Sequence, residues 1–268
     1  YANILIKCKN MKKIIILILF TYCSYSQQNG LLYYGYIESL PTGATKGFDY
    51  NAYLIFNKEM SNYITAKDSL EKTEKIYDEK ISYDEEDNVS ITSGLKVSEE
   101  GDQVVYHIRK KTMWSNFFFK KQIYVKEVTP IINWKISKET KKIGKFNCKK
   151  ATANFRGRDY TAWFTMEIAL PFGPWKLNGL PGLILEAYDT NKHVYWYFKN
   201  IEYPSKTKEK VRFIKIPKSE KFKDYSEFKI FQKQQIEKNK ENQKMINKEY
   251  PNVVFGEPKI ENLFIECE

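Results

Sequence analysis

Val104-Val105-Tyr106-His107-Ile108-Arg109 shows how this chain folds, because alternate positions are apolar while those between them tolerate water. A period of two places successive side chains on opposite faces of a β-strand. The same alternation, rich in aromatic and β-branched residues, predicts strands at Leu31–Glu38, Tyr53–Asn57, Gln122–Val128, Lys149–Phe155, Tyr160–Met166, Leu183–Tyr188, Val194–Ile201 and Lys210–Ile216. Strands of this kind, often joined by short polar turns, favour an antiparallel sheet.

Two segments depart from this pattern. Lys67–Asp87 is dominated by charged residues and has few apolar ones to bury, which predicts a solvated helix or a mobile insertion. Ser219–Tyr250 is the long helical candidate, since Phe222, Tyr225, Phe228 and Phe231 recur at helical spacing. Ser219 is a suitable cap for its start. We expect this helix to pack near the concave side or the edge of the sheet.

The N-terminal region has the pattern of an export signal. Within Met11–Gln27, two lysines precede the apolar run Ile14–Phe20, and small residues follow at Ser24 and Ser26. The apolar run is far shorter than the roughly 20 residues of a membrane-spanning helix. We therefore predict an upstream extension and signal peptide at 1–26, and a single β-rich domain without a transmembrane helix at 27–268. Lipidation at Cys23 is an open alternative, although the bulky Tyr22 disfavours it.

Composition limits the classes of partner. The chain has 268 residues and a formal net charge of +11 at pH 7, but its basic residues are spread out rather than gathered in a run. Dispersed charge is typical of a solvated surface, although it also steers acidic partners such as lipid head groups. Export and the lack of a basic run argue against nucleic acid. We expect the mature protein in the periplasm, at the outer membrane or outside the cell.

Reactive residues are few in the mature chain. Cys148 and Cys267 form a pairable set in an oxidising compartment, and a disulfide and two separate thiols are both open. His107 and His193 lie in strand-like runs without a second ligand at metal spacing. No sequence motif of a nucleophile, a zinc protease or a phosphate-binding loop occurs. We therefore assign no catalytic residue, no metal and no cofactor, and leave enzymatic activity open.

The segment Leu170–Gly182 is a loop of unusual composition. Surface loops are normally polar, whereas this one is rich in large apolar side chains. It either folds inward as a plug on the core or presents an apolar patch to a ligand. Pro181-Gly182 suits the centre of a type II turn, with a positive φ at Gly182. The candidate binding loop consists of Phe172, Pro174, Trp175, Gly179, Leu180, Pro181, Gly182 and Leu183.

Phe155-Arg156-Gly157-Arg158 resembles the tip of a β-hairpin, with Gly157 supplying a positive φ. Arg156 and Arg158 share one strand face under strict alternation. Two guanidinium groups so placed are a candidate contact for a carboxylate or phosphate. The alternative is that they form salt bridges within the hairpin.

This region resembles the GLPGLI family, named for the hexapeptide that occurs here as Gly179-Leu180-Pro181-Gly182-Leu183-Ile184. The lead-in that carries the resemblance consists of Cys148, Lys150-Ala151, Gly157-Arg158, Tyr160-Thr161-Ala162-Trp163, Thr165, Glu167-Ile168 and Gly173-Pro174. Ala169-Leu170-Pro171 departs from the family, which more often has Pro directly after the Ile. The resemblance implies an exported protein of Bacteroidetes-type bacteria and no activity, because the family's function is unknown.

The family's layout also resembles the curved half-barrel of lipoprotein carriers. We therefore expect a mainly β (α+β) fold, with a single strongly curved antiparallel sheet or half-barrel and one long C-terminal helix. The leading hypothesis is non-enzymatic binding of a hydrophobic small molecule or a membrane-protein partner. An envelope hydrolase or redox enzyme with an unrecognised site and a structural envelope component are the alternatives.

Overall fold

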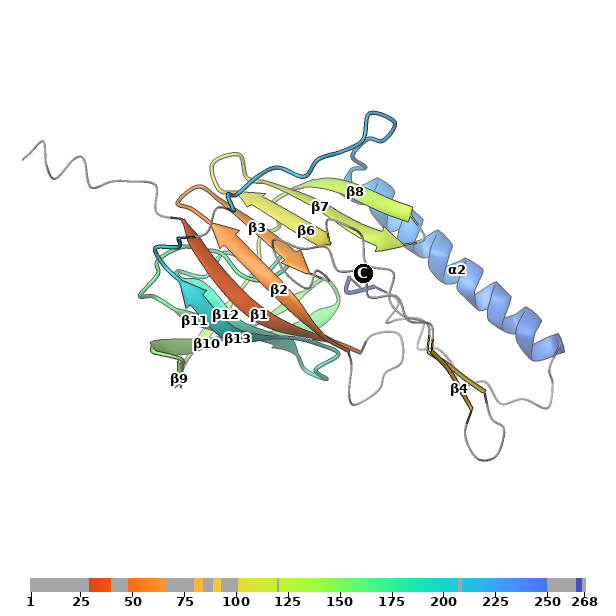
Figure 1. Cartoon of the computed structure of the whole chain (residues 1–268), viewed down its shortest axis with the longest axis horizontal. Coiled ribbons are helices and arrows are strands. Elements are labelled where there is room, and N and C mark those ends of the chain that lie inside the picture. Colours follow the sequence, from red (N-terminus) through yellow and green to blue (C-terminus); the bar gives the residue numbers. More distant parts are fainter. Residues whose placement is uncertain are drawn as a thin grey trace, which may run out of the picture.

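The computed structural model of the chain describes residues 29–39, 48–65, 80–83, 89–92, 101–119, 121–206, 209–249 and 264–266 (Figure 1). The predicted signal peptide, Cys23, Cys267 and most of the charged segment Lys67–Asp87 lie outside these residues. The strands are β1 (Gly30–Glu38), β2 (Phe48–Phe56), β3 (Met60–Thr65), β4 (Lys80–Tyr83), β5 (Val89–Thr92), β6 (Asp102–His107), β7 (Thr112–Phe119), β8 (Lys121–Val128), β9 (Lys135–Ile143), β10 (Phe146–Phe155), β11 (Arg158–Thr165), β12 (Leu183–Asp189) and β13 (Val194–Glu202), and the helix is α2 (Tyr225–Glu249).

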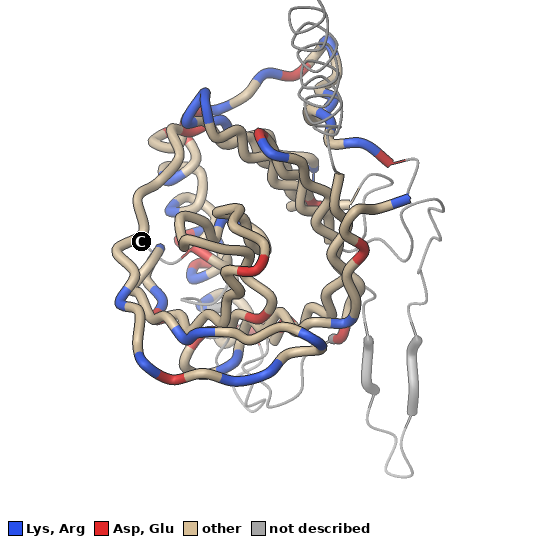
Figure 2. The backbone as a smooth tube through the Cα atoms, turned by 90° about the vertical axis from the view of Figure 1, so that its left-hand side faces the viewer, with Lys and Arg blue, Asp and Glu red and all other residues tan. Residues whose placement is uncertain are grey.

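One antiparallel sheet contains eleven of the described strands, in the order β8-β7-β6-β3-β2-β1-β13-β12-β11-β10-β9. Each half is a meander of neighbouring strands, and the halves meet where β1 pairs with β13. The sheet is not closed: β8 and β9 are its two edges. It curves around an interior, as Figure 2 shows from the side. The prediction of a mainly β fold with a curved antiparallel sheet and a C-terminal helix is confirmed.

The strand pattern follows from burial. In β10, buried and exposed residues alternate almost without a break. In β1 both faces are largely buried, because Leu32, Tyr34 and Tyr36 belong to the main core while Leu31 packs with Tyr53 and Ile55 in a second cluster on the other face. Central strands buried on both faces lose the simple alternation of a half-exposed strand.

Several predicted elements need correction. Lys210–Ile216 is not a strand. It is chain without regular structure whose Val211 and Ile214 pack in separate clusters against strands of the sheet, so its alternation reflects packing on the sheet rather than pairing within it. Strands β3, β5, β7 and β9 were not predicted, and Lys80–Tyr83 forms a strand within the segment expected to be a helix or an insertion.

Helix α2 begins six residues later than Ser219, at Tyr225. Asp224 caps it instead: its Oδ1 accepts the N–H of Glu227 at 2.8 Å, while Glu227 Oε2 accepts the N–H of Asp224 at 2.9 Å. This reciprocal pair is a capping box. Phe228 anchors the first turns against Ile123 and Val125 of the edge strand β8, and the later turns extend beyond the sheet (Figure 1). Among the described residues, no helix is long and apolar enough to cross a membrane.

Candidate functional site

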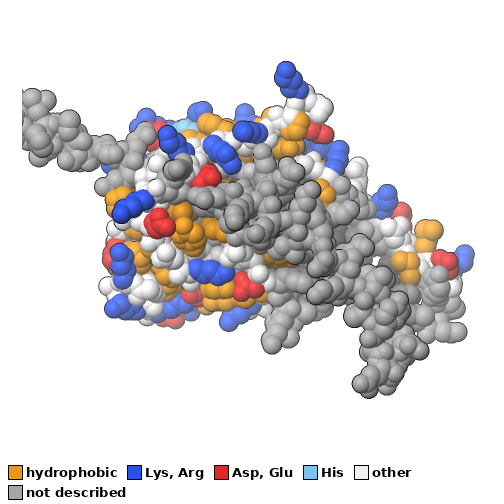
Figure 3. Space-filling view, viewed as in Figure 1, with side chains coloured by type: hydrophobic (Ala, Val, Ile, Leu, Met, Phe, Trp, Pro, Cys, Tyr) orange, Lys and Arg blue, Asp and Glu red, His pale blue; other side chains and the backbone are white. Residues whose placement is uncertain are grey.

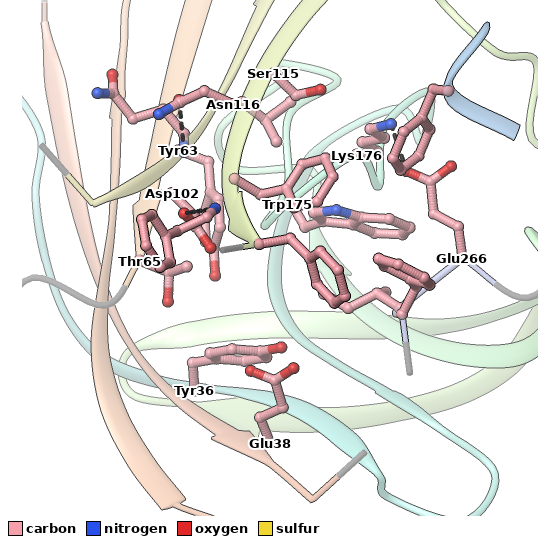
Figure 4. A pocket seen from close by; sticks show the side chains of 18 of the residues that line it. Tyr36, Glu38, Tyr63, Thr65, Asp102, Ser115, Asn116, Trp175, Lys176 and Glu266 are labelled. Atoms are coloured by element: carbon pink, nitrogen blue, oxygen red, sulfur yellow. Dashed lines mark hydrogen bonds and ion pairs between the residues drawn. The ribbon is translucent and has the colours of Figure 1, made fainter. Parts of the chain in front are cut away.

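A cavity of about 180 Å³ opens on the concave side of the sheet (Figure 4). Its walls come from β1, β3, β6, β7 and β13, from the loop at Trp175, from α2 and from the C-terminal segment 264–266. Segments far apart in the sequence therefore meet at one place. The side chains that carry its chemistry fall into three groups: an aromatic wall, two carboxyl groups, and a buried cluster of charges.

The aromatic wall is a stack of three rings. Tyr36 on β1 lies opposite Trp196 on β13 in the strand register, and the two rings stack at 5.2 Å with an interplanar angle of 14°. Trp175 also stacks on Trp196, with ring centroids 6.2 Å apart and an interplanar angle of 10°. Trp196 is held in place because its Nε1 donates a hydrogen bond of 2.7 Å to the hydroxyl of Tyr63. Flat, ordered ring faces of this kind bind rings and cations.

Glu38 and Asp102 line the cavity from β1 and β6. Burial raises the pKa of Asp102 to about 7, against a hydrogen bond of 3.0 Å from the Phe118 N–H, and the nearby Glu38 raises it further. Burial also raises the pKa of Glu38, while a hydrogen bond with Tyr36 and the charge of Arg158 act in the opposite direction. Both carboxyl groups are thus held where their charged forms are poorly solvated. A positively charged ligand or a bound proton compensates for the poor solvation of these carboxylates.

At the other end of the cavity, Lys176 is buried between two carboxylates. Its Nζ lies 2.6 Å from Glu127 Oε1 and 2.5 Å from Glu266 Oε1. Desolvation lowers the pKa of Lys176, but Glu266 and Glu127 together raise it above its ordinary value. The lysine is therefore a fixed cation at neutral pH, which sets the position of both acids.

Arg156 and Arg158 join the same cluster. Arg156 Nη2 bonds Glu127 at 2.5 Å, and its guanidinium lies 3.4 Å above the ring of Tyr225. Arg158 Nη1 bonds Asp189 at 3.2 Å. Both arginines are buried and bind carboxylates of the same chain. The hairpin tip is as expected, because Phe155 pairs with Arg158, and Arg156 and Gly157 between them have φ values of 52° and 77°. Positive φ at both central residues is the type I′ turn.

The loop Leu170–Gly182 folds inward. Phe172, Leu180 and Leu183 are buried in the main core, whereas Gly179 and Pro181 are exposed. Trp175 and Lys176 are the loop's contribution to the cavity. The expected positive φ at Gly182 is wrong, because the glycine with positive φ in this loop is Gly179, at 88°. Gly182 is required for space instead: a Cβ there would lie 2.1 Å from the carbonyl oxygen of Thr165.

Of the remaining candidates, Cys148 is buried, and burial raises its pKa to about 11, which keeps the thiol protonated and unreactive at neutral pH. Its partner in the predicted disulfide, Cys267, lies outside the described residues, so the bridge stays a prediction. His193 Nδ1 lies 3.8 Å from Asp189 Oδ2, but the described residues contain no group of three or more His, Cys, Asp or Glu side chains able to hold a metal ion.

The sequence interpretation found Trp175, Arg156 and Arg158 but missed Glu38, Asp102, Lys176 and Glu266. The sequence does carry a signal for Glu38 and Asp102. Glu38 shares the face of Tyr34 and Tyr36, and Asp102 shares the face of Val104, so each is an acidic residue at a core-facing position of its strand. Nothing in the sequence joins Lys176 to Glu266, which lie 90 residues apart.

Comparison with known proteins gives distant matches. A solved structure of PNGF-II in the C2 space group has a TM-score of 0.45 and 15% identity, covering 66% of this chain and 28% of that one. A second PNGF-II structure, in the P21 space group, has a TM-score of 0.47 and 14% identity, covering 75% and 32%. The chain thus spans about a third or less of the solved chains that it matches. The search of curated proteins found no match. Residues 156–186, the hairpin and loop that supply Arg156, Arg158, Trp175 and Lys176 to the site, match the model of a family described as "Protein of unknown function (Porph_ging)".

Proposed function

We propose that the chain is an exported, non-enzymatic binding protein whose concave cavity holds a small, ring-containing ligand that carries a positive charge or hydrogen-bond donors. The observation that carries this proposal is the combination, in one cavity, of the stacked wall Tyr36–Trp196–Trp175 with the carboxyl groups of Glu38 and Asp102. The resemblance of its Gly179–Ile184 hexapeptide supports membership of the GLPGLI family. Its sequence pattern at 1–26 supports export.

The size of the cavity defines the ligand class. A cavity of about 150 Å³ in another protein holds one benzene molecule. The cavity described here has about 180 Å³, which suits one six-membered ring with a short substituent. A ring stacked on the aromatic wall gains dispersion energy, and a cation there gains both the attraction of the ring faces and a carboxylate partner.

A small molecule suits the loop better than a membrane-protein partner does. The apolar side chains Phe172, Leu180 and Leu183 are buried in the core and present no patch to a docking surface. In the view of Figure 3, the described surface carries separated Lys and Arg side chains with acidic and hydrophobic ones between them. Trp175, which is half-buried, is the large aromatic side chain of the loop that faces the cavity.

A matched series of ring ligands tests the proposal. We expect benzylammonium to bind more tightly than benzyl alcohol, and benzoate to bind least, because only the cation compensates Glu38 and Asp102. Isothermal titration gives the three affinities. The double variant Glu38→Gln/Asp102→Asn should remove the preference for the cation, whereas Glu186→Gln, in a salt bridge with Lys141, should leave it unchanged. Equal binding of the three ligands, or no binding of any, would overturn the proposal.

The natural ligand is identified by native mass spectrometry of the protein from its own host's envelope. A retained small mass that is lost on denaturation supports a carrier or binding protein, and its mass should fit one ring. A bare chain from fresh envelope, together with no binding in the ring series, contradicts the proposal.

A second candidate function is acid–base catalysis, and the raised pKa values of Glu38 and Asp102 favour it. A carboxyl group that titrates near neutral pH is suited to donate a proton to a leaving group, while a second carboxylate activates water. Hydrolysis of chromogenic esters and glycosides, lost in Asp102→Asn but kept in the exposed control Asp159→Asn, would establish this function. Turnover that is unaffected by Asp102→Asn would exclude it.

A further inference from the structure

The C-terminal segment Phe264-Ile265-Glu266 lies in a slot between the β10–β11 hairpin, the loop at Lys176 and helix α2. The segment belongs to no strand or helix. It is held mainly by side chains of the slot that bond its backbone and its one carboxylate. That is how a protein holds a short extended peptide, rather than how it pairs a strand.

The slot provides a polar partner at each of the three positions. Arg158 Nε donates to the carbonyl oxygen of Ile265 at 2.8 Å, and its Nη2 donates to that of Phe264 at 3.3 Å. Lys176 bonds one oxygen of Glu266, and Arg156 Nε lies 3.7 Å from the other. Bonds to carbonyl oxygens are independent of side-chain identity, whereas the two cations require an acid at the third position.

An aromatic pocket receives the first residue of the segment. The ring of Phe264 lies 5.3 Å from Phe119, 6.4 Å from Phe117 and 6.5 Å from Phe228. These rings come from β7 and α2, so they are in place whatever fills the pocket. The slot therefore selects an aromatic residue two positions before an acidic one.

The printed ion pairs of the slot include an acid of the segment among its buried charges. Arg156, Arg158 and Lys176 bring three positive charges, and Glu127 and Asp189 bring two negative charges from the strands of the sheet. The third negative charge is that of Glu266. All six side chains are at least nine-tenths buried. With the segment removed, Lys176 keeps Glu127 but loses the carboxylate of Glu266, and removing one member of a buried charge cluster is strongly unfavourable.

From these contacts we propose that the slot is a peptide-binding site for extended segments of the form aromatic–any–acidic, and that residues 264–266 are its intramolecular occupant. The residues of the slot that contact the occupant's backbone and carboxylate come from 156–176, within the family-matched region, while the occupant lies 90 residues beyond Lys176. The inference is independent of what the concave cavity binds. Since Phe264, Ile265 and Glu266 also form one wall of that cavity, exchange of the occupant would open it on this side.

The test uses the full chain with a weakened occupant, Phe264→Ala/Glu266→Ala, and a capped synthetic peptide of sequence Asn-Leu-Phe-Ile-Glu, which corresponds to residues 262–266. We expect the peptide to bind this variant and raise its melting temperature. It should not bind the wild-type chain, whose slot is filled. A control peptide ending in Gln should bind at least about tenfold more weakly, because it lacks the charge-assisted bonds to Lys176 and Arg156.

Each outcome decides the question. If the variant is folded and binds both peptides equally or binds neither, the proposal is wrong, and the segment is only a structural part of the fold. If the variant is unfolded, recovery of its near-ultraviolet circular dichroism with the Glu peptide, but not with the Gln peptide, supports the site. Failure of both peptides to restore the signal overturns it. A second variant, Glu266→Gln alone, should bind the Glu peptide with intermediate affinity.

Discussion

Asp102 and Lys176 are buried charged residues of the same cavity, yet their charges are compensated to different degrees. Lys176 has a carboxylate on either side, so its charge is compensated within the fold. Asp102 accepts the backbone N–H of Phe118, and the charged residue that acts on it, Glu38, has the same sign. The lysine therefore contributes to a satisfied cluster, while the aspartate leaves the cavity short of positive charge.

The first prediction is that Asp102→Asn stabilises the protein increasingly as the pH rises. An unfolded Asp titrates near pH 4, whereas the folded Asp102 titrates at about 7. The folded chain thus binds the extra proton between these values, so Asp102 lowers stability as the pH rises through this window. Asn keeps an oxygen for the Phe118 N–H without the charge. Melting temperatures of variant and wild type should agree near pH 4 and diverge by at least about 2 °C at pH 8.

The exposed substitution Asp159→Asn is the control and should give a constant difference over the same range. A difference between Asp102→Asn and wild type that does not change with pH would contradict the assignment of the titration to Asp102.

The second prediction is that Lys176→Met destabilises the fold by about 3–5 kcal/mol, because it leaves Glu127 and Glu266 buried side by side. Chemical denaturation measures the free energy of unfolding. The matched control Lys150→Met removes a more exposed partner of Glu139, and it should change stability by no more than about 0.5 kcal/mol. Equal effects of the two substitutions would show that the buried cluster is not an important source of stability.

At the scale of elements, the loop Leu170–Gly182 is fixed by close contact rather than by turn type. Gly182 lies against the end of β11, where its neighbour is the carbonyl group of Thr165. Gly179 has a positive φ, but there is open space where a Cβ would lie. The two glycines of the hexapeptide are thus required for different reasons.

The third prediction separates these reasons. Gly182→Ala forces the loop away from β11 and should cost more than 2 kcal/mol, roughly the effect of severe overpacking. Gly179→Ala meets only backbone strain of about 1 kcal/mol. Unfolding free energies of the two variants give the comparison. A larger loss in Gly179→Ala than in Gly182→Ala would mean that φ, not space, governs the loop.

The sequence predicted most strands and the position of the hairpin, because alternation and turn residues are local signals. The prediction failed where packing between distant segments, rather than local sequence, determines the conformation. Lys210–Ile216 alternates because it lies across the sheet, and Ser219 did not cap α2 because Asp224 and Glu227 form a better reciprocal pair. The cavity was beyond prediction for a similar reason: the approach of Lys176 to Glu266 depends on the whole curved sheet.

At the scale of the whole molecule, the sheet has two edges with different protection. The edge β8 is covered by α2 and by chain at Lys223, which bonds the backbone of Tyr124 and Lys126. The edge β9 is largely exposed and carries four lysines, Lys135, Lys138, Lys141 and Lys142. Lysines on an open edge oppose pairing with a strand of another molecule.

The fourth prediction is that Lys138→Val/Lys142→Val causes association through β9. Light scattering coupled to size-exclusion chromatography should show dimers or larger species at concentrations where the wild type is monodisperse. The control Lys138→Gln/Lys142→Gln removes the charge without adding apolar surface, and it should associate less. A monomeric valine variant would show that this edge is protected by something other than its lysines.

The pairing of β1 with β13, which joins the two halves of the sheet, affects how the protein is made. The ribosome synthesises β1 near the start of the chain and its partner β13 only after β2 to β12. At roughly 5–20 residues per second, β1 waits on the order of ten seconds with one edge bare. Until the second meander arrives, the bare edge of β1 is open to pairing with a strand of another chain, which favours aggregation.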